Sequence, residues 1–152
     1  MDSISRLVSG AQTGADRAAL DFAISHGIPH GGWCPKGRRA EDGRIPPRYD
    51  LIETPSKDYA QRTRWNVRDS DATLIISRSA TLTGGSEYTR RCADELEQPC
   101  LHVHPGNDDP ETIKAFLERH KVKTLNIAGP RESTEPGITG YATAVLERLF
   151  AA

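Results

Sequence analysis

The segment ISRLVSGAQTGADRAALDFAISH, residues 4–26, contains an apolar run, a glycine-rich turn and a helix-like stretch in direct succession. The run Ile4–Val8 predicts a β-strand, and the apolar positions after the turn keep helical spacing until Gly27. The turn Ser9–Asp16 is then expected to expose backbone N–H groups at the positive end of a helix, where phosphate and other oxyanions bind. A tight βα turn without a ligand also explains its glycines, and both interpretations stay open.

A second glycine element has the same setting. The turn Thr83–Ser86 follows the apolar run Ala72–Ser77 and comes at the start of a predicted helix at Gly85–Glu97. In a parallel sheet the turns that follow the strands meet at one edge, where α/β proteins bind their ligands. We therefore expect the two turns to hold one small anionic ligand together. The predicted contacts are Gly10, Gln12, Thr13 and Gly14 in the first turn, and Thr83, Gly84, Gly85 and Ser86 in the second.

Strand-like and helix-like segments alternate along almost the whole chain, which predicts an α/β fold with a mainly parallel sheet and helices on both faces. The continuous apolar run Leu74–Ile76 indicates a strand that is buried on both sides. Predicted strands are Ile4–Val8, Gly31–Cys34, Ala72–Ser77, Cys100–His104 and Thr124–Ala128, with a short further run at Leu51–Glu53. Predicted helices are Ala15–His26, Lys57–Asp69, Gly85–Glu97, Asp109–His120 and Thr139–Phe150.

Length and composition limit the class of protein. With 152 residues, the chain is long enough for a stable core, and we expect residues 1–152 to form a single ligand-binding domain. The 20 basic and 21 acidic residues give a formal charge of −1, which argues against nucleic acid or an anionic membrane as a partner. The sequence has no membrane-length apolar run and no signal peptide, and its three cysteines lack Cys-x-x-Cys spacing. We therefore expect a cytoplasmic protein with free thiols.

The segment Lys36–Asp50 is a long polar connection with a cationic start. Four cations lie within the nine positions that begin at Lys36. Because this segment leaves a predicted strand at the binding edge, we expect the side chains of Lys36, Arg38 and Arg39 to contact an oxyanion. The alternative is a solvated turn in which acidic and basic side chains balance one another.

Five isolated polar residues have both a structural and a functional interpretation. Asp16 lies in the first turn of a predicted helix, where the helix dipole stabilises a carboxylate, and it alternatively binds a sugar hydroxyl or a loop amide. Asp71 is expected to be a turn residue at the opposite edge of the sheet. His102 and His104 point to one face of a strand, but no further ligands stand at motif spacing, so no metal site is predicted. Cys34 is expected to be a small buried hydrophobe rather than a reactive thiol.

Four stretches of the sequence together resemble a known family: SGAQTGADRAALD (9–21), HGGWCPKGRRAEDG (30–43), WNVRDSDATLI (65–75) and LTGGSEYT (82–89). They are similar to the "putative molybdenum carrier" family, also described as circularly permuted YpsA-like, of the SLOG superfamily. The resemblance implies a Rossmann-like fold related to the cytokinin-activating phosphoribohydrolases, the so-called lysine decarboxylase-like proteins. It implies the molybdenum cofactor or a nucleotide as the ligand, with Arg62 and Asn66 as further contacts.

The resemblance to the phosphoribohydrolases is incomplete at their Pro-Gly-Gly-x-Gly-Thr loop, which is followed by a functional Glu. Gly84 and Gly85 match the paired glycines of this loop, but Thr83 replaces the proline. Glu87 and Tyr88 stand where Gly-Thr is expected, and no Glu follows at the usual offset. N-glycoside hydrolysis in the manner of that family is therefore not expected.

Two functional hypotheses follow. The first is a binding protein for a phosphate-bearing ligand of nucleotide-like or pterin type. The alternative is an enzyme, a nucleoside monophosphate N-glycoside hydrolase in which Asp16 or Glu87 is the general acid or base. A homo-oligomer formed through the helices is compatible with both.

Overall fold

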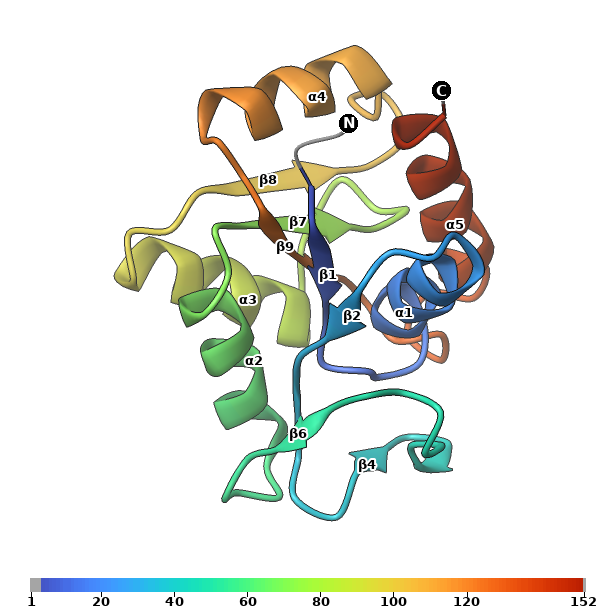
Figure 1. The fold of residues 1–152 in the computed structure, drawn as a ribbon, viewed down its shortest axis with the longest axis vertical. Coiled ribbons are helices and arrows are strands. Elements are labelled where there is room, and N and C mark those ends of the chain that lie inside the picture. Colours follow the sequence, from blue (N-terminus) through green and yellow to red (C-terminus); the bar gives the residue numbers. More distant parts are fainter. Residues whose placement is uncertain (1–3, 152) are drawn as a thin grey trace.

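The computed structural model describes residues 4–151 and has a parallel five-stranded sheet between two layers of helices (Figure 1). The strands are β1 (Arg6–Val8), β2 (His30–Gly31), β7 (Ala72–Ile76), β8 (Cys100–Val103) and β9 (Thr124–Ala128). Their order across the sheet is β2-β1-β9-β7-β8, and every neighbouring pair is parallel. This arrangement confirms the predicted α/β class.

All five predicted helices are present, and their ends lie within two residues of the predicted ones. They are α1 (Ala15–Ser25), α2 (Tyr59–Arg68), α3 (Gly84–Glu95), α4 (Pro110–Arg119) and α5 (Ile138–Leu149). The start of α4 illustrates why the prediction succeeds. The Asp109 carboxylate accepts a hydrogen bond of 3.3 Å from the Thr112 N–H, and Pro110 occupies a position where its missing N–H costs nothing.

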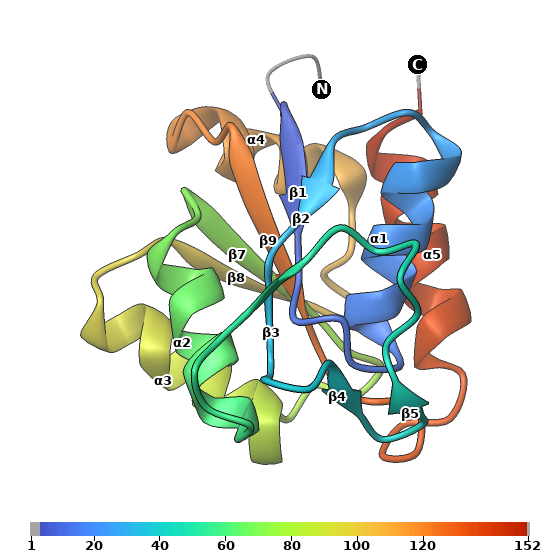
Figure 2. The same cartoon turned by 60° about the horizontal axis from the view of Figure 1, so that its bottom comes forward.

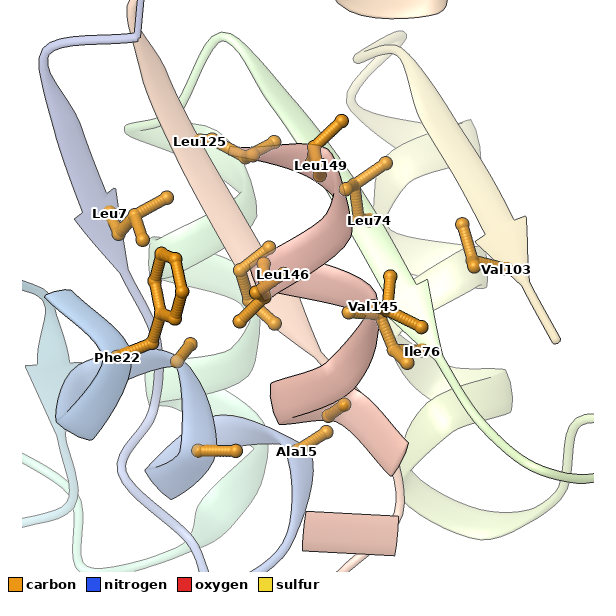
Figure 3. Close-up of a cluster of buried hydrophobic side chains, with 14 of the residues drawn as sticks. Leu7, Ala15, Phe22, Leu74, Ile76, Val103, Leu125, Val145, Leu146 and Leu149 are labelled. Atoms are coloured by element: carbon orange, nitrogen blue, oxygen red, sulfur yellow. The ribbon is translucent and has the colours of Figure 1, made fainter. Parts of the chain in front are cut away.

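The main core lies between the sheet and the helices α1, α4 and α5. Alternate residues of the strands, among them Leu7, Leu74 and Leu125, point to these helices, and Phe22 and Leu146 meet them from the helical side (Figure 3). On the other face of the sheet, α2 and α3 pack side by side over a smaller cluster that includes Val67, Cys92 and Ala93 (Figure 1). Every residue of β7 is buried, as expected for a central strand.

The prediction of a single strand at Gly31–Cys34 is wrong in one respect, because the segment divides at Gly32 into two strands. Its first part, β2, pairs with β1, whereas β3 (Trp33–Cys34) pairs with β6 (Ile52–Glu53) in a separate two-stranded sheet. Gly32 has φ +128°, and a Cβ there would lie 2.3 Å from the Ser9 carbonyl oxygen. The chain thus bends at the residue that only glycine fits.

The long polar connection contains a β-hairpin that the sequence analysis did not predict. Its strands are β4 (Arg39–Ala40) and β5 (Gly43–Arg44), which pair antiparallel. Figure 2 shows the hairpin at the end of the domain toward which β1 runs. It therefore lies beside the carboxyl edge of the sheet, where β1, β9 and β7 end.

The helices do not include a membrane-spanning candidate. Within residues 4–151, none is both long and apolar enough to cross a lipid bilayer.

Candidate functional site

A cavity of about 550 Å³ opens at the carboxyl ends of β1, β9 and β7, a volume in the range that small-molecule ligands occupy. Its walls come from the first glycine turn, the start of α2, the second glycine turn with α3, and the connection between β9 and α5. Nine of the predicted contact residues line it: Gly10, Gln12, Asp16, Arg62, Asn66, Thr83, Gly84, Gly85 and Ser86. Thr13, Gly14, Lys36, Arg38 and Arg39 do not.

The N-terminus of α1 is closed by the connection after β9. The Ala15 N–H donates to the Pro130 carbonyl oxygen at 3.4 Å. Gly14 has φ +86°, and a Cβ there would lie 2.2 Å from the same oxygen. Gly14 therefore serves close packing of the backbone rather than approach of a ligand.

Three other amides of the first turn have partners within it. The Ala11 N–H donates to Ser9 Oγ at 3.2 Å, and the Gln12 N–H donates to Asp16 Oδ2 at 3.4 Å. The Thr13 N–H donates to Gln12 Oε1 at 3.1 Å. This turn consequently presents the side chains of Gln12 and Asp16 to the cavity, and most of its amides are already engaged.

The second glycine turn is open. A Cβ added at Gly84 or Gly85 would meet nothing within 4 Å, and Gly84 has φ +53°. Across residues 4–151, no group accepts a hydrogen bond from the N–H of either glycine. The Ser86 hydroxyl is buried at the cavity wall without a partner in the same part of the chain. The N-terminus of α3 thus offers unused donors to the cavity.

Arg62 and Asp16 form the charged wall between the two turns. The Arg62 guanidinium Nη2 lies 4.0 Å from Asp16 Oδ2, and both side chains are almost fully buried. The Arg62 Nε donates to the Gly10 carbonyl at 3.4 Å, and a Cβ at Gly10 would lie 2.3 Å from that nitrogen. Burial raises the pKa of Asp16 to about 6, and the positive charge of Arg62 opposes the shift.

Two amide side chains complete the floor of the cavity. Gln12 Oε1 accepts hydrogen bonds from the Thr13 and Glu41 N–H groups, whereas its buried Nε2 has no partner among the described residues. Asn126 Nδ2 donates to Thr73 Oγ1 at 3.1 Å. Asn126 was not predicted, although a polar residue within the apolar strand Thr124–Ala128 is a recognisable signal.

Asn66 separates the cavity from a smaller one of about 170 Å³ behind it, and it lines both. Its Oδ1 accepts from the Trp33 N–H at 2.8 Å, and its Nδ2 donates to the Trp33 carbonyl at 2.9 Å. The Trp33 ring lies edge-on to Trp65, with 4.8 Å between ring centroids. Asn66 therefore fixes the position of β3 as well as forming the cavity wall.

The cationic connection is held mainly by its own backbone. The Arg38 guanidinium donates to the carbonyl oxygens of Ile45, Pro46 and Tyr49 at 3.0, 2.7 and 2.9 Å. Lys36 is exposed. These positions favour the alternative of a structural, solvated segment for Lys36 and Arg38.

Glu41, at the tip of the hairpin, joins three loops beside the cavity. Its carboxylate accepts hydrogen bonds from the Thr13 hydroxyl, the Ser133 hydroxyl and, at 3.3 Å, the Ser133 N–H. These bonds hold the pKa of Glu41 below its usual value. Ser133, Thr134, Tyr59 and Arg131, which line the cavity, were missed because no glycine motif marks them.

The other residues singled out in the sequence lie away from the cavity. Glu87 is exposed and pairs with Arg91 at 3.6 Å. Asp71 Oδ2 accepts from the N–H groups of Lys123 and Thr124 at 2.9 and 2.8 Å, which agrees with a turn role.

Neither the histidine pair nor the cysteine forms part of the site. His102 Nε2 shares a hydrogen bond of 2.6 Å with Ser77 Oγ. Cys34 is fully buried, and burial raises the pKa of its thiol. The described residues contain no group of three or more His, Cys, Asp or Glu side chains that would hold a metal ion.

Comparisons with known proteins show to which family this chain belongs. The family model described as "Circularly permutated YpsA SLOG family" matches residues 7–150. The chain belongs to this family. A crystal structure from Syntrophus aciditrophicus, named "Putative molybdenum carrier protein", is 48% identical to this YpsA-family chain. The match covers 98% of this chain and 96% of the other, with a TM-score of 0.95. None of the curated proteins compared with it matches. The resemblance noted in the sequence and the Rossmann-like fold it implies are thereby confirmed.

Proposed function

We propose that the protein binds a small phosphate-bearing ligand of nucleotide-like or pterin type, with the phosphate at the N-terminus of α3. The observation that carries the proposal is the open turn at Gly84 and Gly85, together with the unpartnered hydroxyl of Ser86. Free amides at a helix N-terminus and a neighbouring guanidinium, here that of Arg62, favour an oxyanion. The first turn contributes Gln12 and Asp16 to the remainder of the ligand.

The polar groups of the cavity suit the ring system of such a ligand. The unpartnered Gln12 Nε2 is a hydrogen-bond donor, Asn126 lines the same wall, and a protonated Asp16 is a donor as well. Nucleobases and pterins carry acceptors and donors along one edge, so both classes fit this set.

The name of the similar crystal structure suggests molybdenum as a cargo. The polar lining consists of amides, hydroxyls, guanidinium groups and one carboxylate, that of Asp16, and no cysteine or histidine belongs to it. Such donors bind oxyanions rather than bare cations. We therefore propose that, if molybdenum is the cargo, it binds as an oxyanion or as part of a phosphate-bearing pterin.

The test is calorimetry with a panel of nucleoside monophosphates, alongside native mass spectrometry for a copurified nucleotide or pterin. The variant Gly85→Asp adds a side chain and a negative charge at the open turn, so we expect affinity to fall by at least about tenfold. Gly140→Asp is the matched control, because Gly140 is exposed in α5 with nothing within 4 Å. Equal losses in the two variants, or none in Gly85→Asp, contradict the proposed phosphate position.

The second candidate function is hydrolysis of a nucleoside monophosphate, and it rests on Asp16 alone. A carboxyl group that faces the cavity with a pKa of about 6 has the properties of a general acid or base. Glu87 lies outside the cavity. Incubation with nucleoside monophosphates followed by chromatography separates the candidates: release of free base at an enzymatic rate, abolished in Asp16→Asn, favours the hydrolase.

A further inference from the structure

The ring of Tyr59 is surrounded by three arginine side chains from three separate segments. The Cζ atoms of Arg39 and Arg62 lie 5.2 Å from the ring centroid, and that of Arg131 lies 5.4 Å from it. All three distances are within the range of cation–π attraction. Arg39 comes from the hairpin, Arg62 from α2 and Arg131 from the connection after β9. We call these four residues the Tyr59 cluster.

The three guanidinium groups of the cluster outnumber the two carboxylates that lie within 4.0 Å of them among the described residues, those of Glu41 and Asp16. Glu41 lies 4.0 Å from Arg131, and its carboxylate also accepts hydrogen bonds from the Thr13 and Ser133 hydroxyls. Asp16 lies 4.0 Å from Arg62 and, with a pKa of about 6, is only partly ionised near pH 6. Arg39 donates to a neutral group, the carbonyl of Lys57, at 2.7 Å.

The pKa of Arg62 reflects both its burial and the charges around it. This pKa is lowered chiefly by burial; the negative charge of Asp16 opposes this shift, and the positive charge of Arg131 adds to it. Since Tyr59, Arg62 and Arg131 line the cavity, this excess positive charge faces the space in which a ligand binds. An anion there would relieve the repulsion and accept bidentate hydrogen bonds from the guanidinium groups.

The topology separates Arg39 and Arg131 from the open turn of α3, whereas Arg62 belongs to the wall between the two turns and is shared by both subsites. The open turn follows β7, whereas Arg131 follows β9, the strand between β7 and β1. Arg39 lies on the hairpin, which contacts the turn after β1 through the hydrogen bond from Glu41 N–H to Gln12 Oε1. Figure 2 shows the hairpin strands and α3 as separate parts of this end of the domain. The cluster therefore extends the site from the open turn toward β1.

We propose that the Tyr59 cluster is a second anion subsite, and that the natural ligand carries a second anionic group, phosphate or carboxylate, in addition to the phosphate at α3. This inference rests on the proposed function for the position of the first phosphate. It narrows the ligand class from singly phosphorylated molecules to molecules with two separated anionic groups. The recognition at the cluster is by paired guanidinium groups, which favour planar or tetrahedral oxyanions.

The first test compares adenosine 3′,5′-bisphosphate with adenosine 5′-monophosphate by calorimetry. We expect the wild-type protein to bind the bisphosphate at least about tenfold more tightly, as two additional charge-assisted contacts imply. The double variant Arg39→Gln/Arg131→Gln is expected to lose this preference. Arg119→Gln is the matched control, since Arg119 is an exposed arginine at the end of α4 and does not line the cavity, and it should keep the preference. Should the double variant fail to fold, Arg131→Gln alone is measured, with an intermediate loss expected.

The second test places the anions directly and separates the two proposals. Crystals of the wild-type protein and of the variants Gly85→Asp and Arg39→Gln/Arg131→Gln are soaked in selenate and examined by anomalous scattering. Two selenium peaks, one at Gly85 and one at the Tyr59 cluster, support both proposals. A peak at the cluster alone supports the second subsite and overturns the phosphate position at α3. No peak at the cluster, or an unchanged preference for the bisphosphate in the double variant, overturns the second subsite.

Discussion

Arg62 Nη2 and Asp16 Oδ2 lie 4.0 Å apart at a wall of the cavity, too far for a hydrogen bond, although both side chains are about nine-tenths buried. Burial penalises both charges, and their mutual attraction without a direct bond offsets only part of that penalty. The pair is therefore a source of instability in the free protein that a ligand with its own charges and donors relieves.

Replacing Asp16 by Asn should stabilise the free protein at alkaline pH. The folded-state pKa of about 6 exceeds the ordinary 3.8, so folding favours the protonated form and stability falls as pH rises between these values. The difference corresponds to about 3 kcal/mol as an upper bound. Urea unfolding at about pH 5 and about pH 8 measures it, and an Asp16→Asn variant that is less stable than wild type at the higher pH would show that the ionised pair is favourable.

Gly14 and Gly85 should differ in their sensitivity to the same substitution, although both come at the start of a helix. Gly14→Ala places a Cβ 2.2 Å from the Pro130 carbonyl at φ +86°, so we expect a loss of about 2–4 kcal/mol in the free energy of unfolding. Gly85→Ala meets open space and should change it by less than about 0.5 kcal/mol. Thermal and urea unfolding of the two variants check this contrast, and equal stabilities would mean that the α1 turn is not closed as described.

Glu41→Gln should loosen the hairpin and the connection after β9 together. The amide accepts hydrogen bonds less strongly than the carboxylate, which has contacts with Thr13, Ser133 and Arg131. Hydrogen exchange of residues 39–44 and 131–134 is expected to accelerate, while residues of β7 are unaffected. The pKa of Glu41 in the folded protein lies below the usual value of 4.5. The same loosening should therefore appear in the wild-type protein as the pH falls through this lowered pKa and the carboxylate is protonated. Glu111→Gln, at an exposed position of α4, is the control.

Asp71→Ala should destabilise the fold without altering ligand binding. The Asp71 carboxylate joins the start of β9 to β7 through the N–H groups of Lys123 and Thr124. Its loss leaves two amides without this acceptor, so we expect about 1–3 kcal/mol of destabilisation. Calorimetry under conditions where the variant is folded should give the wild-type affinity. A selective loss of affinity would instead connect the far edge of the sheet to the site.

The elements of this fold are accessible from sequence because each has a local signature. Helical spacing in α1, α4 and α5 and the continuous apolar run of β7 depend on neighbours a few positions away. The position of β9 between β1 and β7 has no such local signature, since it depends on pairing between residues more than fifty positions apart, such as Leu74 with Ile127. The hairpin β4–β5 was missed because two-residue strands have no periodicity.

The lining of the candidate cavity was predictable where glycine or a motif marks it and not elsewhere. Gly10, Arg62 and Gly85 were expected and line the cavity. The closed state of the first turn depends on Pro130, which the fold brings to Gly14 from 116 positions along the chain. Arg131 and Tyr59 reach the cavity in the same manner, by long-range packing that leaves no local pattern.

The hydrogen bonds of Asn66 give the protein an optical reporter of its own. The chain contains two tryptophans, and both are in one edge-on pair whose backbone at Trp33 is tied to Asn66, a residue of the cavity wall. We expect a displacement of Asn66 to shift Trp33, which lines the smaller cavity on the other side of the wall. Intrinsic fluorescence therefore offers a label-free screen for ligands, with no dye attached near the site and no residue replaced.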